Sequence, residues 1–593
     1  AEGRASYYHT VTKETSWPKP AEPAAGGGGA QSGLAGRGAE NDHDALMHKL
    51  ISLLANLSYN SESNCARIMA RDGVPTLEKA MQTFRYKPTV LEVIFVTFNN
   101  LCFVSAENKL AIGRRCGDEI VAVIGDHSKQ TKLVTMALKT VGNLTAEDEC
   151  VEIVIKEGVI KAIVAGMHAV QELTSSASDE HLLQLVSIQV VANLASAGID
   201  LDEELLEKDP SAHDRTIAHT IFAEGGAHAI LKVASESLDD TNLLLPALKG
   251  LECVCEDVQT AAKLAPHGLV DFVISVMQTH DQDPDIIDPS FELAGTLCEC
   301  APCAEMLVNQ GFLPILLSAM KELSEDVPNL LVNGAIALAH IAALRRFSAQ
   351  LVSAGVVDAL KVFLDDNSQG ELGDDETQFL LEALKAIAEI ASDAQSRTAV
   401  GNKATGSIIT VCRRHMRNSE VLESAFKALS ILAFDKSNLA TIVKLGGINV
   451  IMQGIAKNSR AEQLMVRAIT TIDFIAMGDP QYSLLVVKCG GKMMISKIQG
   501  VYKVRSYARP PTQRQFDSYP IHPLTQHLII SHTFSLLTSR ASQLANNNYL
   551  QASPAIQAAA TSALTAMEAA EKRDTPDTTA LLSGSRRARR AKK

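Results

Sequence analysis

The 593-residue sequence has few aromatic side chains. Phe, Trp and Tyr together make up 4% of the residues, with a single Trp, whereas apolar residues make up 46%. This balance disfavours β-sandwiches that depend on aromatic cores and suits helices rich in Leu, Ala and Val. At this length a single hydrophobic core has stopped growing, so we expect several domains or an array of repeats.

The motifs that mark common catalytic and nucleotide-binding sites are also missing from the sequence. It contains no Walker phosphate loop, no H-E-x-x-H, no G-x-S-x-G and no glycine-rich dinucleotide turn. We therefore expect no enzyme activity and no cofactor. Because no uninterrupted apolar run approaches the roughly 20 residues of a membrane-spanning helix, we expect no membrane partner. The expected location is cytoplasmic, with cytoskeletal, ciliary and nuclear locations left open.

The eleven cysteines lie mostly inside apolar helical patterns and follow no evenly spaced framework. We therefore expect reduced core thiols rather than disulfides. Cys298, Cys300 and Cys303 lie one repeat after Cys253 and Cys255, which could bring thiolates together on zinc. However, C-x-C on a helix points the two sulfurs about 200° apart, and paired C-x2-C halves are missing. Buried thiols are the better interpretation, and we expect no metal.

Charge is divided unevenly along the chain. The net charge is −13, yet residues 501–593 contain thirteen Lys or Arg against five Asp or Glu. The last eight residues hold six cations: Arg586, Arg587, Arg589, Arg590, Lys592 and Lys593. Such a tail suits tubulin tails, anionic lipid, nucleic acid or a nuclear-import receptor, or it only keeps the chain soluble. Without interleaved aromatic residues it gives little support to specific nucleic-acid recognition.

A glycine that opens an apolar helical segment recurs through most of the sequence. Its successive spacings are 44, 41, 68, 42, 43, 44, 51, 41 and 44 residues. The two long intervals contain the acidic stretches Ile199 to Glu204 and Asp374 to Glu376, which we interpret as solvated loop insertions. The glycines are Gly73, Gly117, Gly158, Gly226, Gly268, Gly311, Gly355, Gly406, Gly447 and Gly491.

A longer amphipathic segment lies between successive glycines. In one of these segments the apolar positions i, i+3, i+4, i+7, i+8 and i+11 form one stripe of an α-helix. No unit can bury this stripe alone, so the units are expected to stack into a continuous core. The residues of this stripe are Leu133, Met136, Ala137, Thr140, Val141 and Leu144.

The period, the glycine before the second helix and the third-helix pattern together resemble the armadillo repeat family over about residues 43–500. HEAT repeats have similar periods. The resemblance implies an all-α fold, a right-handed α-α superhelix of about ten repeats. With helix spacings of roughly 8–10 Å, its length would be on the order of 80–100 Å.

The segment with Tyr7-Tyr8, Trp17 and Pro20 resembles the second half of a WW domain. The resemblance implies a short β remnant in which Tyr7 and Trp17 grip proline-rich ligands. The family's first Trp would lie before Ala1, and a two-stranded remnant is marginal on its own. The expected organisation is a partial WW domain (1–20), a flexible linker (21–42), the array (43–500), a helical extension (501–585) and a basic tail (586–593).

In peptide-binding members of the armadillo family, an Asn on the third helix pairs with the backbone of an extended ligand. An Asn side chain provides both a donor and an acceptor; the alternative is that each Asn holds its own loop. Importin-α-like adaptors add a Trp one turn earlier, which this array lacks, so a nuclear-import receptor is disfavoured. The corresponding residues are Asn56, Asn100, Asn143 and Asn193, with Lys139 and Gln189 one turn before the last two.

These features predict a protein–protein interaction scaffold that holds an extended partner segment in the concave groove. The alternative is an architectural element of a cytoskeletal or ciliary assembly, anchored by its outer helices and the basic tail.

Overall fold

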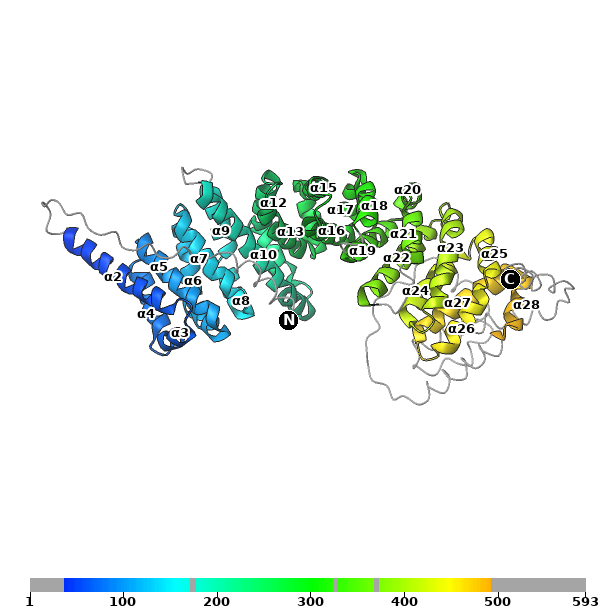
Figure 1. Cartoon of the computed structure of the whole chain (residues 1–593), viewed down its shortest axis with the longest axis horizontal. Helices are drawn as coiled ribbons and strands as arrows, with labels where there is room; N and C mark the ends of the chain where they lie inside the picture. The colour runs from blue at the N-terminus through cyan, green and yellow to red at the C-terminus, as the bar shows by residue number, and fades with distance from the viewer. Residues whose placement is uncertain (1–36, 171–176, 324–327, 367–372, 492–593) are drawn as a thin grey trace.

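A computed structural model describes residues 37–170, 177–323, 328–366 and 373–491. These ranges fold into helices and contain no strand. Figure 1 shows them stacked into an elongated arch. The predicted all-α repeat array is confirmed at this level. The predicted WW segment, most of the linker, the C-terminal extension and the basic tail lie outside the described residues.

A typical repeat contains two short helices followed by a longer third helix. In the described part of the chain, nine repeats lie between a lone third helix, α2 (Arg37–Ser58), and the first helix of a further repeat, α28 (Pro480–Lys488). The helix α2 begins six residues before the predicted start of the array. The repeats are α3 (Glu62–Met69), α4 (Gly73–Thr83), α5 (Pro88–Val104); α6 (Ala106–Asp126), α7 (Thr131–Leu144); α8 (Asp148–Lys156), α9 (Val159–Val170), α10 (Ala177–Lys208); α11 (Ile217–Ala223), α12 (Gly226–Glu236), α13 (Thr241–Cys255); α14 (Val258–Leu264), α15 (Leu269–Thr279), α16 (Pro284–Glu299); α17 (Ala301–Asn309), α18 (Phe312–Glu322), α19 (Pro328–Ala343); α20 (Ser348–Ser353), α21 (Val356–Asp366), α22 (Asp374–Ser392); α23 (Arg397–Arg414), α24 (Ser419–Leu432); and α25 (Lys436–Lys444), α26 (Gly447–Lys457), α27 (Glu462–Gly478).

A residue in the left-handed conformation forms the sharp corner between the first and second helices of most repeats, either the recurring glycine itself or the residue directly before it, as at Gly225 and Gly446. Gly311, for example, has a φ of 87°, a left-handed conformation that costs glycine little, and Phe312 directly after it is fully buried. Two predicted corners are wrong, because Gly117 and Gly406 lie inside the continuous helices α6 and α23. A polar residue follows each of these glycines, so the apolar anchor that begins the second helix elsewhere is missing.

The acidic stretch from Ile199 to Glu204 is helical, so its interpretation as a solvated loop is wrong. It lengthens α10, and its apolar residues Ile199 and Leu201 pack against the core. The Asp202 carboxylate accepts hydrogen bonds from the backbone N–H groups of Ile217 (2.6 Å) and Ala218 (3.0 Å). An acidic group is favourable at such a helix N-terminus, here that of α11.

The second acidic stretch is likewise not a loop. Asp374 to Glu376 form the first turn of α22, so the loop interpretation is wrong for these residues too.

The third helix α10 is apolar on more than one side. By length and composition alone, α10 is long and apolar enough to cross a membrane. Three bent pairs of helices would also be long and apolar enough if each pair counted as one span. The sequence analysis overlooked this property. Within α10, 61% of its most apolar 18-residue stretch is buried inside the array, because α10 packs between the third helices α7 and α13. Burial against two neighbours therefore accounts for the apolar composition.

Third helices form the spine of the array. Each packs extensively on the third helix of the next repeat, whereas the second helices of neighbouring repeats touch at few points. The array therefore curves toward its third helices, and in the middle of Figure 1 the second helices α12, α15 and α18 lie along the outer side of the arch.

Candidate protein-binding surface

The solvent-facing side chains of the third helices from α5 to α27 form one continuous surface along the inner side of the curve. We refer to it as the third-helix surface. Its repeat spacing follows from the spine packing, because each repeat adds one third helix. A surface built in this way presents side chains at regular intervals, which suits a long ligand better than a compact one.

Three of the four predicted asparagines lie on this surface, whereas Asn56 lies on α2, just before it. Asn56 is exposed, whereas Asn100, Asn143 and Asn193 are half-buried. The side-chain amide of Asn100 donates to Ala55 O (2.9 Å) on the preceding third helix.

Asn143 repeats this arrangement one helix later. Its amide donates to Asn99 Oδ1 (3.0 Å), and Asn99 in turn donates to Met136 O (3.3 Å). The donors of Asn100 and Asn143 therefore connect neighbouring repeats. Within the described residues no hydrogen bond reaches the Oδ1 atom of either side chain, which leaves two acceptors for a ligand backbone.

Lys139 and Gln189, the predicted companions of the asparagines, are both half-buried on the same surface. Burial lowers the pKa of Lys139. Lys139 lies one helical turn before Asn143 on α7.

The later third helices carry an excess of acidic residues that was not predicted from the sequence. The four helices α13, α16, α22 and α24 contain twelve Asp or Glu against three Lys. Because the acids fall on different repeats, no local sequence run reveals them; aligning the third helices by repeat would have done so. The acids are Glu252, Asp285, Asp288, Glu292, Glu299, Asp374, Asp375, Glu376, Glu382, Glu389, Glu420 and Glu423.

The three lysines are each held by carboxylates. Lys249 Nζ lies 2.9 Å from Glu252 and 3.4 Å from Glu292 on the next repeat. Lys427 Nζ lies 3.0 Å from Glu389 and so joins α24 to α22. These pairs neutralise part of the acidic surface and leave a net negative charge.

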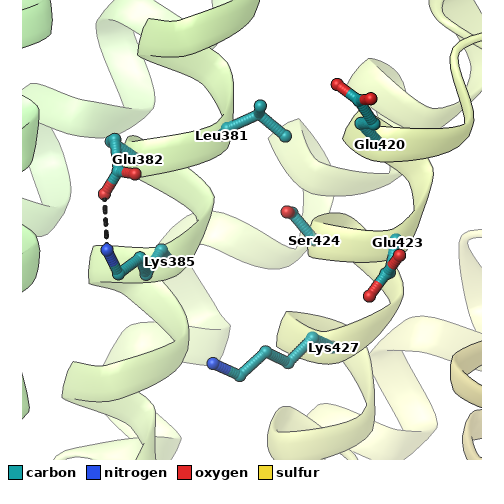
Figure 2. A pocket seen from close by; sticks show the side chains of 7 residues that line it. All are labelled: Leu381, Glu382, Lys385, Glu420, Glu423, Ser424 and Lys427. Carbon is teal, nitrogen blue, oxygen red and sulfur yellow. Dashed lines mark hydrogen bonds and ion pairs between the residues drawn. The ribbon is translucent and has the colours of Figure 1, made fainter. Parts of the chain in front are cut away.

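A shallow cleft of about 320 Å³ lies between α22 and α24. Figure 2 shows the side chains that line it, with the Lys385–Glu382 ion pair (3.0 Å) on α22 and Lys427 extending from α24 toward α22. Glu420 and Glu423 line the α24 side, and neither forms an ion pair among the described residues. The remaining lining residues are Leu381 and Ser424.

Several of these carboxyl groups are shifted toward their neutral forms. Burial raises the pKa of Glu423 although the charge of Arg467 opposes the shift, and burial with Glu292 raises the pKa of Asp288. Desolvation, followed by the charge of Glu252, raises the pKa of Glu256 at the end of α13 to about 7. A bound cation would favour the ionised form of each group.

The cysteine cluster is part of the core. Cys298, Cys300 and Cys303 are buried, as are Cys253 and Cys255 one repeat earlier. Burial raises the pKa of Cys253 to about 12 and that of Cys255 well above its ordinary value, which disfavours the thiolates that zinc requires. Among the described residues no group of three His, Cys, Asp or Glu is arranged to hold a metal ion.

His340 lies on α19 with its Nε2 3.9 Å from Glu299 Oε1. Burial first, then the charge of Lys385, lowers its pKa. The side chain therefore lies on the third-helix surface as a neutral imidazole beside an acid.

Comparison with solved structures identifies neighbours of the array, of which one covers most of it. A chain from work on the phosphorylation switch that controls the interaction between cadherin and beta-catenin matches with a TM-score of 0.57. The match covers 72% of this chain and 82% of that chain at 12% sequence identity. The chain has an armadillo-like fold. At this identity the armadillo-like array is all that the similarity establishes.

Other comparisons add little to this result. Two engineered proteins of solved structure match at TM-scores of 0.37 and 18% identity, over 43% and 42% of this chain and 97% and 98% of theirs. No protein-family model and no curated protein sequence matches the chain.

Proposed function

We propose that this chain is a non-enzymatic scaffold that holds an extended segment of a protein partner along its third-helix surface. The continuous row of third helices carries this proposal. A fully extended segment advances about 3.3 Å per residue, and packed helices lie roughly 8–10 Å apart. Every third residue of the ligand would therefore meet a new repeat. The armadillo-like neighbour, described with cadherin and beta-catenin, supports a protein as the class of partner.

The charge of the surface favours a partner segment rich in Lys and Arg. Twelve acids against three lysines on α13, α16, α22 and α24 produce a negative potential along several repeats. The cleft between α22 and α24 offers the unpaired carboxylates of Glu420 and Glu423 to one cationic side chain. Toward the N-terminus, the free oxygens of Asn100 and Asn143 would accept backbone N–H groups of the same segment.

A peptide selection with purified protein tests this proposal. Extended peptides selected from a random library should be enriched in Lys and Arg, and their affinity should fall as salt is raised. The paired change Glu420→Gln and Glu423→Gln should weaken binding about fivefold, given 0.2–1 kcal/mol for each exposed ion pair. Asp271→Asn, an exposed acid on the second helix α15, is the matched control and should leave affinity unchanged.

The asparagines provide an independent arm of the test. Replacing Asn100 and Asn143 together by Ala should lower affinity roughly tenfold, since each lost hydrogen bond costs about 0.5–1.5 kcal/mol. Circular dichroism must show intact helices, because Asn100 also ties α5 to α2. Selected peptides without charge preference, together with unchanged affinity in both double variants, would contradict the proposal.

The architectural alternative has a different signature. If removal of Arg586 to Lys593 abolishes partner binding while both third-helix variants bind normally, the tail and not the third-helix surface is the site.

A further inference from the structure

The first helix of the array carries an uncovered row of leucines. Leu46, Leu50, Leu53 and Leu57 of α2 are 55%, 49%, 55% and 46% exposed. Their spacing of four, three and four residues places them within about 60° of one another around the helix. They form a single stripe, which we call the α2 stripe.

The α2 stripe corresponds to the core face of the later third helices. Shifting by 44 residues, the distance from Asn56 to Asn100, places the stripe on Val90, Ile94, Thr97 and Leu101 of α5. All four are buried, at 1%, 0%, 0% and 0% exposure. The helix α5 is contacted by the first and second helices of its own repeat, α3 and α4. Within the described residues, the stripe is therefore a core surface that no first or second helix of its own repeat covers.

The rest of α2 is firmly held in the array. Ile51 and Ala55 are 3% and 6% exposed and face the spine, where α2 packs on α5. Asp44 forms an ion pair with Lys87 (2.5 Å) before α5. The exposure of the stripe thus belongs to an ordered, docked helix and not to a detached one.

The sequence directly before α2 offers little to cover the stripe. In residues 1–36 the only Val, Leu, Ile or Met side chains are Val11 and Leu34, and residues 26–29 are all Gly. Two aliphatic side chains cannot match four leucines spread over three helical turns.

A second copy of the same helix does match. Leucines alternating at four and three residues form the seam of a two-helix coiled coil, in which each stripe is the complement of its own copy. Among the residues of α2 from 43 onward, whose exposure the structure describes, the exposed neighbours of the stripe include one charged side chain, Lys49, so like-charge repulsion there is small. The helix α2 is the first described helix and lies at one end of the described array, and the rest of the array extends to one side of it (Figure 1).

We propose that two copies of this chain associate through the α2 stripe, helix against helix, to form a dimer of arches joined end to end. One helix pair is at the small end of protein interfaces, so the dimer should have a dissociation constant in about the micromolar range. The assembly presents two third-helix surfaces and gives bivalent binding to a partner that repeats its recognition segment.

Light scattering after size exclusion, on the full chain from about 1 to about 100 µM, tests the proposal. The average molar mass should rise from that of a monomer to that of a dimer as the concentration increases. Leu50→Glu with Leu53→Glu should give one copy throughout, since each dimer would bury four new carboxylates. Val362→Glu, an exposed apolar residue on α21 (52% exposed), is the matched control and should dimerise like the wild type.

Circular dichroism and the melting temperature verify that the glutamate variant is folded. If it is not, Leu46→Ala with Leu57→Ala provides the second variant, and it should raise the dissociation constant about 100-fold because each change occurs twice in the dimer. A wild-type chain that stays monomeric at about 100 µM would overturn the proposal, whatever else covers the stripe. A dimer that survives the leucine changes would overturn it as well. Peptide binding to the third-helix surface should be unaffected by these changes, which separates this result from the proposed function.

Discussion

Two glycines at equivalent points of the repeat should respond in opposite ways to the same substitution. Gly311 forms the corner between α17 and α18 with a φ of 87°, while Gly406 lies within the continuous helix α23. At both positions a Cβ atom would meet nothing within 4 Å. Steric effects are therefore equal at the two positions, and backbone conformation alone decides whether alanine stabilises or destabilises the protein.

The magnitudes follow from that conformation. For an L-residue the left-handed region costs about 1–2 kcal/mol, partly offset by about 0.4–1 kcal/mol from the lower entropy of the unfolded chain. Gly311→Ala should therefore destabilise by about 1 kcal/mol. Gly406→Ala should stabilise by about 0.5–1 kcal/mol, because glycine inside a helix is that much worse than alanine.

Native-state hydrogen exchange is the appropriate assay, because a repeat array opens locally and a single unfolding free energy is poorly defined for it. Amides of α18 should exchange faster in Gly311→Ala, and amides of α23 should exchange more slowly in Gly406→Ala. If the two variants shift local stability in the same direction, α23 is not continuous at Gly406 and the structural reasoning fails.

Three further predictions concern packing, pH and metals. Gly401→Ala should destabilise the protein by about 1–3 kcal/mol, because the new Cβ would clash with the buried amide of Asn438, and urea unfolding would show the loss. The melting temperature should fall between about pH 5 and pH 7.5, since the folded chain holds the Glu256 proton up to about pH 7 whereas the unfolded chain releases it near 4.5; Glu256→Gln should flatten this slope. Chelators should leave the melting temperature unchanged, because the cysteines around Cys303 are buried in the core and hold no metal in this prediction; a chelator-induced drop with stoichiometric zinc would contradict it.

The repeat period, the helical class and the placement of the third helices could be predicted from sequence. Hydrophobic spacing reports which face of a helix is buried, as for Leu133 to Leu144, and burial is what the stacked fold requires. The continuity of α6 and α23 could not be predicted from the glycine spacing alone, which placed corners at Gly117 and Gly406. The residue after it, Asp118 or Ser407 instead of an apolar anchor such as Phe312, was the available signal.

The candidate site was less predictable. The asparagines stand at one position of each repeat, so alignment finds them, but the donor bonds of Asn100 and Asn143 to neighbouring helices depend on stacking. The acidic excess arises only when α13 to α24 lie side by side. Likewise, Asp202 looks like a solvated charge until α11 folds against the end of α10.

The two continuous helices also affect how the arch would respond to force. A solenoid behaves as a spring whose compliance resides in the joints within and between its repeats. Most repeats have a glycine corner at which the first helix can pivot on the second, but α6 near one end and α23 near the other replace this pivot with unbroken hydrogen-bonded helix. Under tension along the array, we expect these two repeats to act as stiff couplings and the stretch between them to absorb most of the extension.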